Sequence, residues 1–344
     1  MQKAAYMTGI NKLEIREIDM PIPRGDQVIV KVDYVGICGS DVHYLEYGKI
    51  GDFIVNGDFR LGHECAGTIT KVGSDVTALK IGDRVALEPG CTCGQCDFCK
   101  TGRYNLCPDV EFLATPPFHG CLLNYIAYPA NMCFMLPENV STMEGALVEP
   151  LAVGIHAARQ GGVSLGDSVV ILGAGCIGLV TLLACKAFGA TNVVVVDVIP
   201  KRLKLAKRLG ATHIINAAEC DCLEEVESLT QGKGADVIIE TAGTPRTYTQ
   251  TSYLVKRGGT IVLVGLAPQD TIEFNFAKLM NKEAQIKTVF RYRNIYPQAI
   301  AAIAQGQIDV SAIVTHEFEF AETAKAFDYV INNKNDVVKA VIKV

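Results

Sequence analysis

The sequence predicts an α/β protein in which a doubly wound parallel sheet is joined to a second domain rich in β-strands. Its 344 residues, 49% of them hydrophobic, exceed the usual length of a single domain. Beyond residue 166, runs of strand length alternate with amphipathic segments, a pattern typical of parallel strands connected by helices. Before residue 150, short β-rich runs separated by turn residues predict the second domain.

The first part of the chain is expected to contain little helix, and its runs with strand character are 27–35, 65–72 and 83–87. In the second part, the corresponding runs are 168–172, 193–197, 213–215, 236–240, 260–264 and 286–290. Segment 200–209 is expected to be a helix, because Pro200 suits its first turn and Gly210 its end. The last residues contain one helical stretch near 299–305 and are expected to pack onto the first domain.

A glycine-rich string predicts a nucleotide site. Gly173, Gly175 and Gly178 form G-x-G-x-x-G between a predicted strand and a helix, where a pyrophosphate can approach the helix N-terminus. Asp197 ends the next predicted strand, so its carboxylate can accept adenosine-ribose hydroxyls and repel a 2′-phosphate. NAD is therefore expected, although Arg202 leaves NADP use open and Asp197 could instead cap a helix. The residues assigned to the cofactor site are Gly173, Gly175, Ile177, Gly178, Asp197, Arg202, Leu266 and Phe290.

Four closely spaced cysteines predict a structural zinc site. Cys93, Cys96, Cys99 and Cys107 follow C-x2-C-x2-C-x7-C, a spacing that lets a short lobe wrap four thiolates around one zinc with no open position. Cys91 breaks this spacing and is interpreted as a bystander. A zinc ribbon for nucleic acid and a redox cysteine cluster are the disfavoured alternatives.

A second set of possible metal ligands is scattered: Cys38, His63, Glu64 and Glu149. A thiolate, an imidazole and a carboxylate form a shell that leaves zinc open to water or substrate. Taken singly, each residue is more often a small buried side chain or a satisfied polar group. Only their combination predicts a catalytic metal.

Composition restricts the compartment and the partners. A net charge of -5 argues against a general nucleic-acid binder. Residues 1–20 lack an apolar signal-peptide core, and the uncharged stretch 169–185 is divided by glycines and short for a membrane span. The thirteen cysteines are odd in number, and five of them crowd between 91 and 107, which favours a reduced metal protein over disulfides. We expect a cytoplasmic protein that acts on a small molecule and binds neither nucleic acid nor membrane.

These strings resemble the zinc-containing medium-chain alcohol dehydrogenases, whose signature G-H-E-x-x-G matches residues 62–67, followed by Gly73. Residues 82–85 and the cysteine lobe are similar to the same family. The resemblance implies two zinc ions per chain and a homotetramer. It implies that Cys38, His63 and Glu64 hold the catalytic zinc, with Glu149 either ligating zinc or holding its water. The implied domains are a GroES-like catalytic domain at 1–152 with its zinc lobe near 90–108, a Rossmann NAD-binding domain at 153–290, and a return to the catalytic domain at 291–344.

Within that family, the sequence is most similar to sorbitol (L-iditol 2-), xylitol and related polyol dehydrogenases, through residues 40–44, 114–118, 148–151 and 289–292. The resemblance implies oxidation of a secondary alcohol of a polyol to a ketose, with hydride transfer to NAD. The enzymatic alternatives are L-threonine 3-dehydrogenase and a butanediol-type secondary alcohol dehydrogenase. A non-catalytic NAD-binding protein is the alternative from another class.

The resemblance also implies roles near the catalytic zinc. Zinc is expected to activate the substrate hydroxyl, and Ser40 and His43 match the family's proton relay, although Ser40 could merely cap a helix. Polyol hydroxyls need hydrogen-bond partners inside the site. The catalytic candidates are Ser40, His43, Tyr44 and Glu149, and the substrate candidates are Tyr44, Phe118, Glu149, Arg291 and Tyr292. Tyr44 could instead be core packing, and Arg291 a salt bridge or cofactor contact.

Overall fold

The computed structural model describes residues 1–267, 269 and 271–344 and divides into two compact units. The terminal unit comprises Met1–Glu149, Tyr296–Gly306 and Val314–Val344, and the central unit comprises Pro150–Ile295 and Gln307–Ile313. The divisions at 149/150 and 295/296 lie near the expected boundaries at 152/153 and 290/291. Residues 307–313 differ from the expectation, because they belong to the central unit rather than to the C-terminal return.

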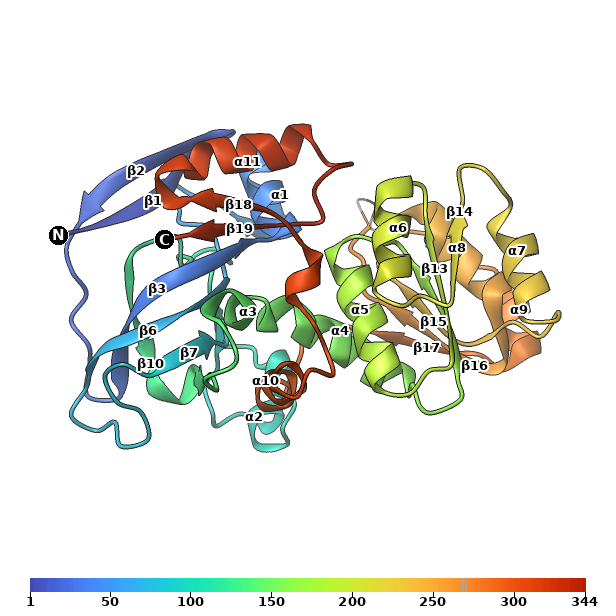
Figure 1. The fold of residues 1–344 in the computed structure, drawn as a ribbon, viewed down its shortest axis with the longest axis horizontal. Helices are drawn as coiled ribbons and strands as arrows, with labels where there is room; N and C mark the ends of the chain where they lie inside the picture. The colour runs from blue at the N-terminus through green and yellow to red at the C-terminus, as the bar shows by residue number, and fades with distance from the viewer. Residues whose placement is uncertain (268, 270) are drawn as a thin grey trace. The chain divides into compact units, whose positions relative to one another are not determined.

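A mixed sheet forms the framework of the terminal unit, with strand order β11-β7-β6-β3-β19-β18 and β10 paired to β3 (Figure 1). These strands are β3 (Gln27–Ile37), β6 (Glu64–Val72), β7 (Arg84–Leu87), β10 (Tyr125–Pro129), β11 (Cys133–Met135), β18 (Val314–Glu319) and β19 (Lys339–Lys343). The smaller strands are β1 (Gln2–Gly9), β2 (Lys12–Ile18), β4 (Lys49–Ile50), β5 (Phe53–Ile54), β8 (Gly90–Cys91) and β9 (Glu111–Phe112). The two chain termini thus contribute to one unit.

Helices are more numerous in the first part of the chain than its sequence predicts. The helices of this unit are α1 (Gly39–Tyr47), α2 (Asp97–Lys100), α3 (Thr142–Ala146), α10 (Tyr296–Ala304) and α11 (Thr323–Asn332), and α4 (Val148–Gly161) begins in it. Three short 3₁₀ turns occur at Tyr104–Leu106, Ala130–Met132 and Phe320–Glu322, and a fourth, Ser311–Ile313, lies in the central unit. These helices are short, and tertiary packing overrides weak local periodicity in such segments.

The register of three strands brings distant residues together at one end of the sheet. Glu64, the first residue of β6, lies opposite Gly36 near the end of β3. Ala340 in β19 lies opposite Ile37, which is the last residue of β3. Cys38, which follows β3, and Lys339, which begins β19, therefore lie at the same end of neighbouring strands. Val30 and Val35 of β3 and Leu87 of β7 belong to the hydrophobic core of this unit.

The central unit is a six-stranded parallel sheet with the order β14-β13-β12-β15-β16-β17, which confirms the predicted doubly wound class. Its strands are β12 (Ser168–Leu172), β13 (Asn192–Asp197), β14 (His213–Asn216), β15 (Ala235–Glu240), β16 (Val255–Leu263) and β17 (Gln285–Thr288). Its helices are α5 (Cys176–Ala187), α6 (Pro200–Arg208), α7 (Cys222–Leu229), α8 (Pro245–Leu254) and α9 (Phe276–Lys282). In Figure 1, α5 and α6 lie on one side of the sheet and α7, α8 and α9 on the other.

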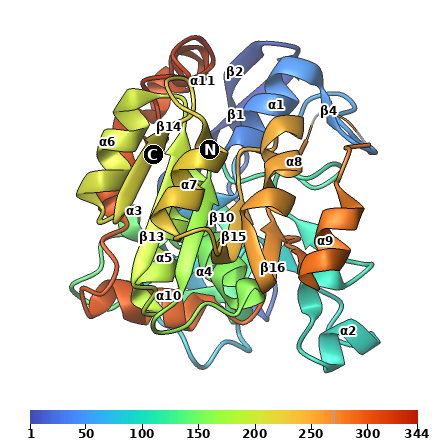
Figure 2. The same ribbon diagram turned by 90° about the vertical axis from the view of Figure 1, so that its right-hand side faces the viewer.

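The strand order of this sheet reverses between β12 and β15, which are neighbours although β13 and β14 separate them in sequence. Figure 2 shows the central unit from the side of the sheet that carries α7, α8 and α9. Parallel sheets bind ligands beyond the carboxyl ends of their strands at such a reversal. The segments that follow β12, β13 and β15 are therefore the candidate ligand-binding segments of this unit.

Candidate functional site

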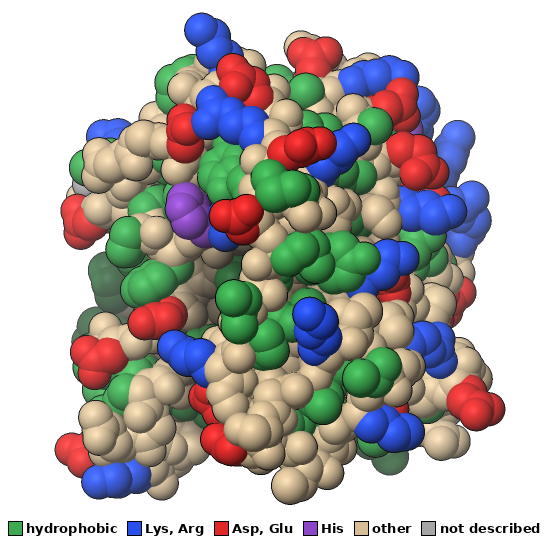
Figure 3. All heavy atoms as spheres, turned by 90° about the vertical axis from the view of Figure 1, so that its left-hand side faces the viewer, with side chains coloured by type: hydrophobic (Ala, Val, Ile, Leu, Met, Phe, Trp, Pro, Cys, Tyr) green, Lys and Arg blue, Asp and Glu red, His purple; other side chains and the backbone are tan. Residues whose placement is uncertain are grey.

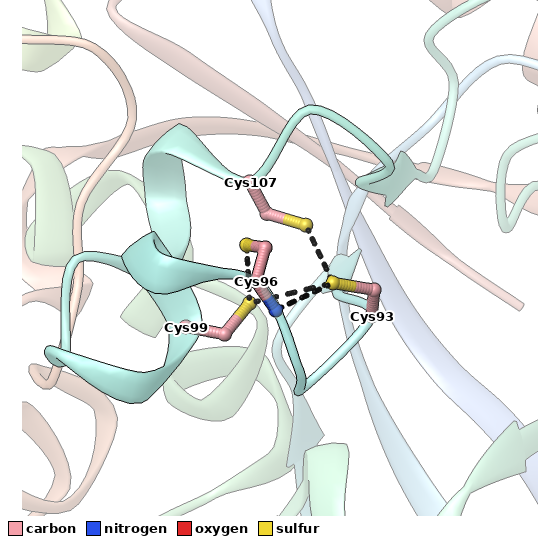
Figure 4. Close-up of side chains that lie close together, drawn as sticks. All are labelled: Cys93, Cys96, Cys99 and Cys107. Atoms are coloured by element: carbon pink, nitrogen blue, oxygen red, sulfur yellow. Dashed lines mark hydrogen bonds between the residues drawn. The ribbon is translucent and has the colours of Figure 1, made fainter.

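Four cysteines converge in the lobe that follows β8 (Figure 4). The sulfur atoms of Cys93 and Cys107 lie 3.5 Å apart, those of Cys96 and Cys99 3.5 Å, and those of Cys93 and Cys99 4.0 Å. All four sulfurs lie within 4.8 Å of one another, whereas Cys91 is outside the group. Four thiolates at such separations suit tetrahedral zinc with no open position.

The environment of the lobe favours a thiolate at Cys93. Backbone N–H groups of Gln95 and Cys96 donate toward its sulfur and lower the Cys93 pKa to about 7. Burial has the opposite effect on Cys107 and raises its pKa to about 11. Thiols must lose their protons to bind zinc, so a preformed thiolate in this group fits a metal site.

A buried carboxyl group fastens the lobe to the sheet. Glu88, which follows β7 and is 4% exposed, accepts a hydrogen bond of 2.7 Å from the Tyr104 hydroxyl of the lobe. The Tyr128 hydroxyl donates to the Glu88 carbonyl oxygen at 2.7 Å. Burial raises the pKa of Glu88 to about 7, although the Tyr104 hydroxyl opposes the shift. Sequence reasoning missed Glu88, because a single acidic residue beside a proline carries no local signal.

The second group of possible ligands forms where strands of the terminal unit end. Cys38 follows β3, His63 precedes β6, and Glu64 begins β6. One ligand atom of each lies within 4.8 Å of the others. His63 and Glu64 are buried, and Cys38 is half-buried. A mixed thiolate, imidazole and carboxylate set fits zinc with a position left for an alcohol.

Lys339, the first residue of β19, is a member of this site that sequence reasoning missed. Its Nζ donates to Oε1 and Oε2 of Glu64 at 2.8 and 2.6 Å and to the carbonyl oxygen of Ile37 at 3.1 Å. Both side chains are buried, with exposed fractions of 2% and 1%. A Cβ atom on Gly36 would lie 2.0 Å from Oε2 of Glu64, so only glycine leaves room for the carboxylate there. Glu64 therefore belongs to the group of possible metal ligands and also forms a buried ion pair with Lys339.

Asp41 joins the two ligand-bearing segments. Its Oδ2 accepts from the Cys38 backbone N–H at 3.1 Å, and its Oδ1 accepts from that of Gly62 at 2.8 Å. The same Oδ1 lies 3.6 Å from Nδ1 of His63. Burial lowers the pKa of His63, but Asp41 and Cys38 outweigh it and raise the pKa well above its usual range. The site is thus electrostatically negative and suited to a cation.

The remaining candidates in the terminal unit differ in their surroundings. Ser40 is half-buried and His43 exposed on α1, where Asp41, not Ser40, accepts from the Cys38 N–H. Tyr44 is 3% exposed and packs in the core with Phe59, the position expected of a packing residue. Glu149 is buried but lies outside the three-residue ligand group, and Phe118 is half-buried. Ligation by Glu149 and substrate contacts by Tyr44 and Phe118 stay predictions.

The glycine motif of the central unit has the conformation that close nucleotide binding needs. Gly173 has φ of 102°, which favours glycine, and a Cβ on Gly178 would lie 1.9 Å from the Gly173 carbonyl oxygen. Helix α5 begins directly after Gly175. A cavity of about 350 Å³ lies beside the motif and is also lined by Asp197 and Arg202.

Asp197 is rigidly oriented at the end of β13. Its Oδ2 accepts from the Ala174 N–H at 2.6 Å, and its Oδ1 accepts from those of Val198 and Ile199 at 2.7 and 2.9 Å. The carboxylate therefore organises the turns around the cavity. Arg246 at the start of α8 also lines this cavity, and sequence reasoning missed it.

The last cofactor and substrate candidates lie in the loops after β16 and β17. Leu266 is 81% exposed and Phe290 51% exposed, so neither side chain is part of the core. Ile177 is half-buried in the first turn of α5. Arg291, with φ of 55°, places its guanidinium 4.8 Å from the Phe290 ring centre, and Tyr292 is buried. Their roles stay predictions.

One face of the terminal unit carries side chains of both signs of charge. Figure 3 shows acidic and basic side chains interspersed on one face, without a continuous basic stripe among its described residues. Within residues 1–267, 269 and 271–344, no helix combines the length and the apolar character needed to cross a membrane.

Comparisons with known proteins agree with this geometry. Residues 24–138 match the model of the alcohol dehydrogenase GroES-like domain, and residues 176–305 match that of the zinc-binding dehydrogenase. The chain is 50% identical to an uncharacterized zinc-type alcohol dehydrogenase-like protein of Escherichia coli, covering 96% of each chain. It is 45% identical to a sorbitol dehydrogenase of Bacillus subtilis, covering 99% of this chain and 96% of the relative. It is 43% identical to an L-idonate 5-dehydrogenase of Vitis vinifera, covering 93% and 88%.

Solved structures show the same similarity along the whole chain. A crystal structure of an oxidoreductase/dehydrogenase of unknown specificity from Escherichia coli matches with a TM-score of 0.96 and 48% identity, covering 100% and 99% of the two chains. A zinc-binding dehydrogenase of Sinorhizobium meliloti bound to NADP matches with a TM-score of 0.91 and 30% identity, covering 100% and 99%. An alcohol dehydrogenase of Escherichia coli complexed with NADH matches with a TM-score of 0.92 and 29% identity, covering 100% and 99%.

Proposed function

Because this chain belongs to the zinc-containing medium-chain alcohol dehydrogenases, close to the sorbitol dehydrogenases, we propose that it oxidises a secondary alcohol of a polyol to a ketose with NAD as hydride acceptor. The protein is an oxidoreductase with a GroES-like domain and a Rossmann domain, and its family uses zinc and a nicotinamide cofactor. The polyol and the preference for NAD are the proposed part. The observation that carries the proposal is the group formed by Cys38, His63 and Glu64.

The residues of this group would hold a catalytic zinc, which would act as a Lewis acid toward the alcohol. Lys339 would keep the Glu64 carboxylate in place, and Asp41 would fix the segments that carry Cys38 and His63. The four-cysteine lobe would hold a second, structural zinc. We therefore propose two zinc ions per chain, and Glu149 as a further polar contact at the catalytic one.

Ser40 and His43 would carry the alcohol proton to solvent. They lie three residues apart on α1, so they share one face of the helix. Ser40 is half-buried and His43 exposed, which orders them from the interior to the surface. Polyol hydroxyls beside the reacting carbon would bind Glu149, Arg291 and Tyr292, because unpaired polar groups in a closed site are costly.

The preference for NAD rests on Asp197. Its fixed carboxylate beside the glycine motif would accept ribose hydroxyls and repel the 2′-phosphate of NADP. Arg202 and Arg246 line the same cavity, and their positive charges favour the 2′-phosphate of NADP. Values of kcat/KM for the two cofactors test the assignment, and a higher value with NADP would refute it.

A panel of alcohols tests the substrate class on the purified, zinc-loaded protein. NADH production is measured with sorbitol, xylitol, iditol, arabinitol, galactitol, L-idonate, butanediol and threonine. We expect the highest kcat/KM with one of the polyols. Faster oxidation of threonine or butanediol would replace the proposed substrate class, and no oxidation of any alcohol would remove the catalytic proposal.

Assembly is a separate proposal. We propose that the protein is cytoplasmic and forms a homotetramer. The family resemblance and exposed apolar side chains such as Phe276 and Met280 on α9 support the tetramer. Light scattering after size-exclusion chromatography is expected to give four chain masses. A measured mass equal to that of one chain would contradict the proposed tetramer.

A further inference from the structure

A buried carboxyl group lies at the reversal point of the central sheet, directly behind the nucleotide cavity. Glu240 is the last residue of β15, where it lies opposite Leu172 of β12 and Leu263 of β16. Its side chain is 0% exposed. Leu172 leads into the glycine motif, so Glu240 adjoins the start of the cofactor site without lining its cavity.

Three donors meet at one oxygen of this carboxyl group. Oε1 of Glu240 accepts from the backbone N–H groups of Ala242 and Gly243, both at 2.9 Å, and from the Thr247 hydroxyl at 2.8 Å. Oε2 is buried and has no hydrogen-bond partner among the described residues. Carboxyl groups are costly to bury, which predicts a role beyond packing. Here one oxygen shapes the whole turn 241–244 and the first turn of α8.

That turn forms a wall of the nucleotide cavity. Thr241, Ala242, Thr244 and Thr247 all line it. The Thr241 hydroxyl donates to the carbonyl oxygens of Leu172 and Gly173 at 2.9 and 3.2 Å, which links the turn to the glycine motif. A shift of the turn would therefore move two walls of the site together.

The segment 264–266 is fastened to the same residue. The Glu240 carbonyl oxygen accepts from the N–H groups of Val264 and Gly265 at 2.9 and 3.1 Å. A Cβ on Gly265 would lie 2.8 Å from Oε2 of Glu240 and 2.4 Å from the Gly243 nitrogen. The Tyr248 hydroxyl donates to the Gly265 carbonyl oxygen. Glu240 and Tyr248 thus hold segment 264–266 against the turn from two sides.

We propose that Glu240 and Tyr248 are positioning residues of the cofactor site, which hold turn 241–244 and segment 264–266 in the arrangement that binds the dinucleotide. Neither side chain lines the cavity. Glu240 acts through Ala242 and Thr247, which do, and Tyr248 acts through Gly265, which packs against Glu240 and Gly243. The inference rests on the proposed function only in taking this cavity as the nicotinamide-dinucleotide site. Glu240 and Tyr248 are thus expected to affect the affinity for the cofactor and not the rate of the chemical step.

Two variants and one control test the inference on the zinc-loaded full chain. Glu240→Gln keeps the shape but weakens the three bonds to Oε1, and Tyr248→Phe removes only the hydroxyl that holds Gly265. The control is Thr251→Val, which removes a hydroxyl from buried Thr251 of α8 whose one hydrogen bond among the described residues is to the Tyr248 carbonyl oxygen. NADH binding is measured by fluorescence titration, and initial rates give KM for NAD and kcat.

We expect each positioning variant to raise the Kd for NADH and the KM for NAD roughly fivefold, with kcat at saturating NAD nearly unchanged. The control is expected to change the Kd less than about twofold. If both positioning variants bind NADH as tightly as the control, whatever their melting temperatures, the inference is wrong. If Glu240→Gln does not fold, Tyr248→Phe decides by the same criterion. Failure of the wild-type protein to bind NADH would instead overturn the proposed function, and the inference with it.

Discussion

Lys339 donates to both carboxylate oxygens of Glu64, at 2.8 and 2.6 Å, although 275 residues separate them in the chain. The pair is buried, and removal of one member of such a pair leaves an uncompensated charge that costs about 3–5 kcal/mol. Glu64 is an expected ligand of the catalytic zinc. The pair therefore also joins β19, near the C-terminus, to the strands that carry the ligands.

Replacement of Lys339 by Met should therefore lower both stability and activity. We expect a loss of about 3 kcal/mol in unfolding free energy and a large fall in kcat, because Glu64 loses the ammonium group of Lys339 as its partner. Lys256→Met is the control, since its ion pair with Asp236 is partly exposed and should contribute less than about 1 kcal/mol. Chemical denaturation and initial rates measure both. Equal effects of the two substitutions would deny Lys339 a special role.

His63→Ala should abolish turnover but preserve cofactor binding. The variant removes the imidazole from the ligand group in the terminal unit, whereas the glycine motif and Asp197 belong to the central unit. We expect a loss of kcat of about a thousandfold or more and a Kd for NADH within about twofold of wild type. Substantial residual catalysis would argue against zinc bound by this group.

Cys99→Ser should remove the structural zinc and leave the catalytic one. Its sulfur lies 3.5 Å from that of Cys96 and 4.0 Å from that of Cys93, so the set loses a ligand. Metal analysis is expected to fall from two zinc ions per chain to one, with a lower melting temperature. Cys91→Ser, outside the group, should retain both ions. Two zinc ions in Cys99→Ser would contradict the assignment.

Glu88 should make stability depend on pH. Burial raises its pKa from 4.5 to about 7, so the folded protein binds this proton more tightly than the unfolded chain. Its stabilising contribution is complete below pH 4.5 and is lost as the pH rises to about 7. Glu88→Gln should remove that slope and raise stability above pH 7 by up to about 3 kcal/mol.

Melting temperatures between about pH 5.5 and 8.5 check this expectation. The exposed Glu138 provides the control, because Glu138→Gln should leave the pH profile of the wild type in place. If Glu88→Gln keeps the wild-type slope, another group causes the dependence.

Local patterns made part of this molecule predictable. The glycine motif, the parallel strands and the four cysteines each reside in a short segment, where periodicity and spacing are visible. Lys339 was not predictable, because its partner is remote and a lysine in a strand usually faces solvent. Asp41 is close to Cys38 in sequence but remote from Gly62, and only the fold shows that it joins the two segments. For Tyr44 the sequence left core packing and substrate contact open, and the fold places its side chain in the core.

The bonds of Asp41 to the Cys38 and Gly62 amides have a practical consequence. They fix the backbone beside both ligands through protein atoms alone, so the pocket for the ion does not depend on the ion for its shape. Dialysis against a chelator and then against cobalt(II) should therefore refill it without refolding. In Cys99→Ser, which is expected to lack the structural metal, the absorption bands of cobalt bound to Cys38 would then report each alcohol that enters the site.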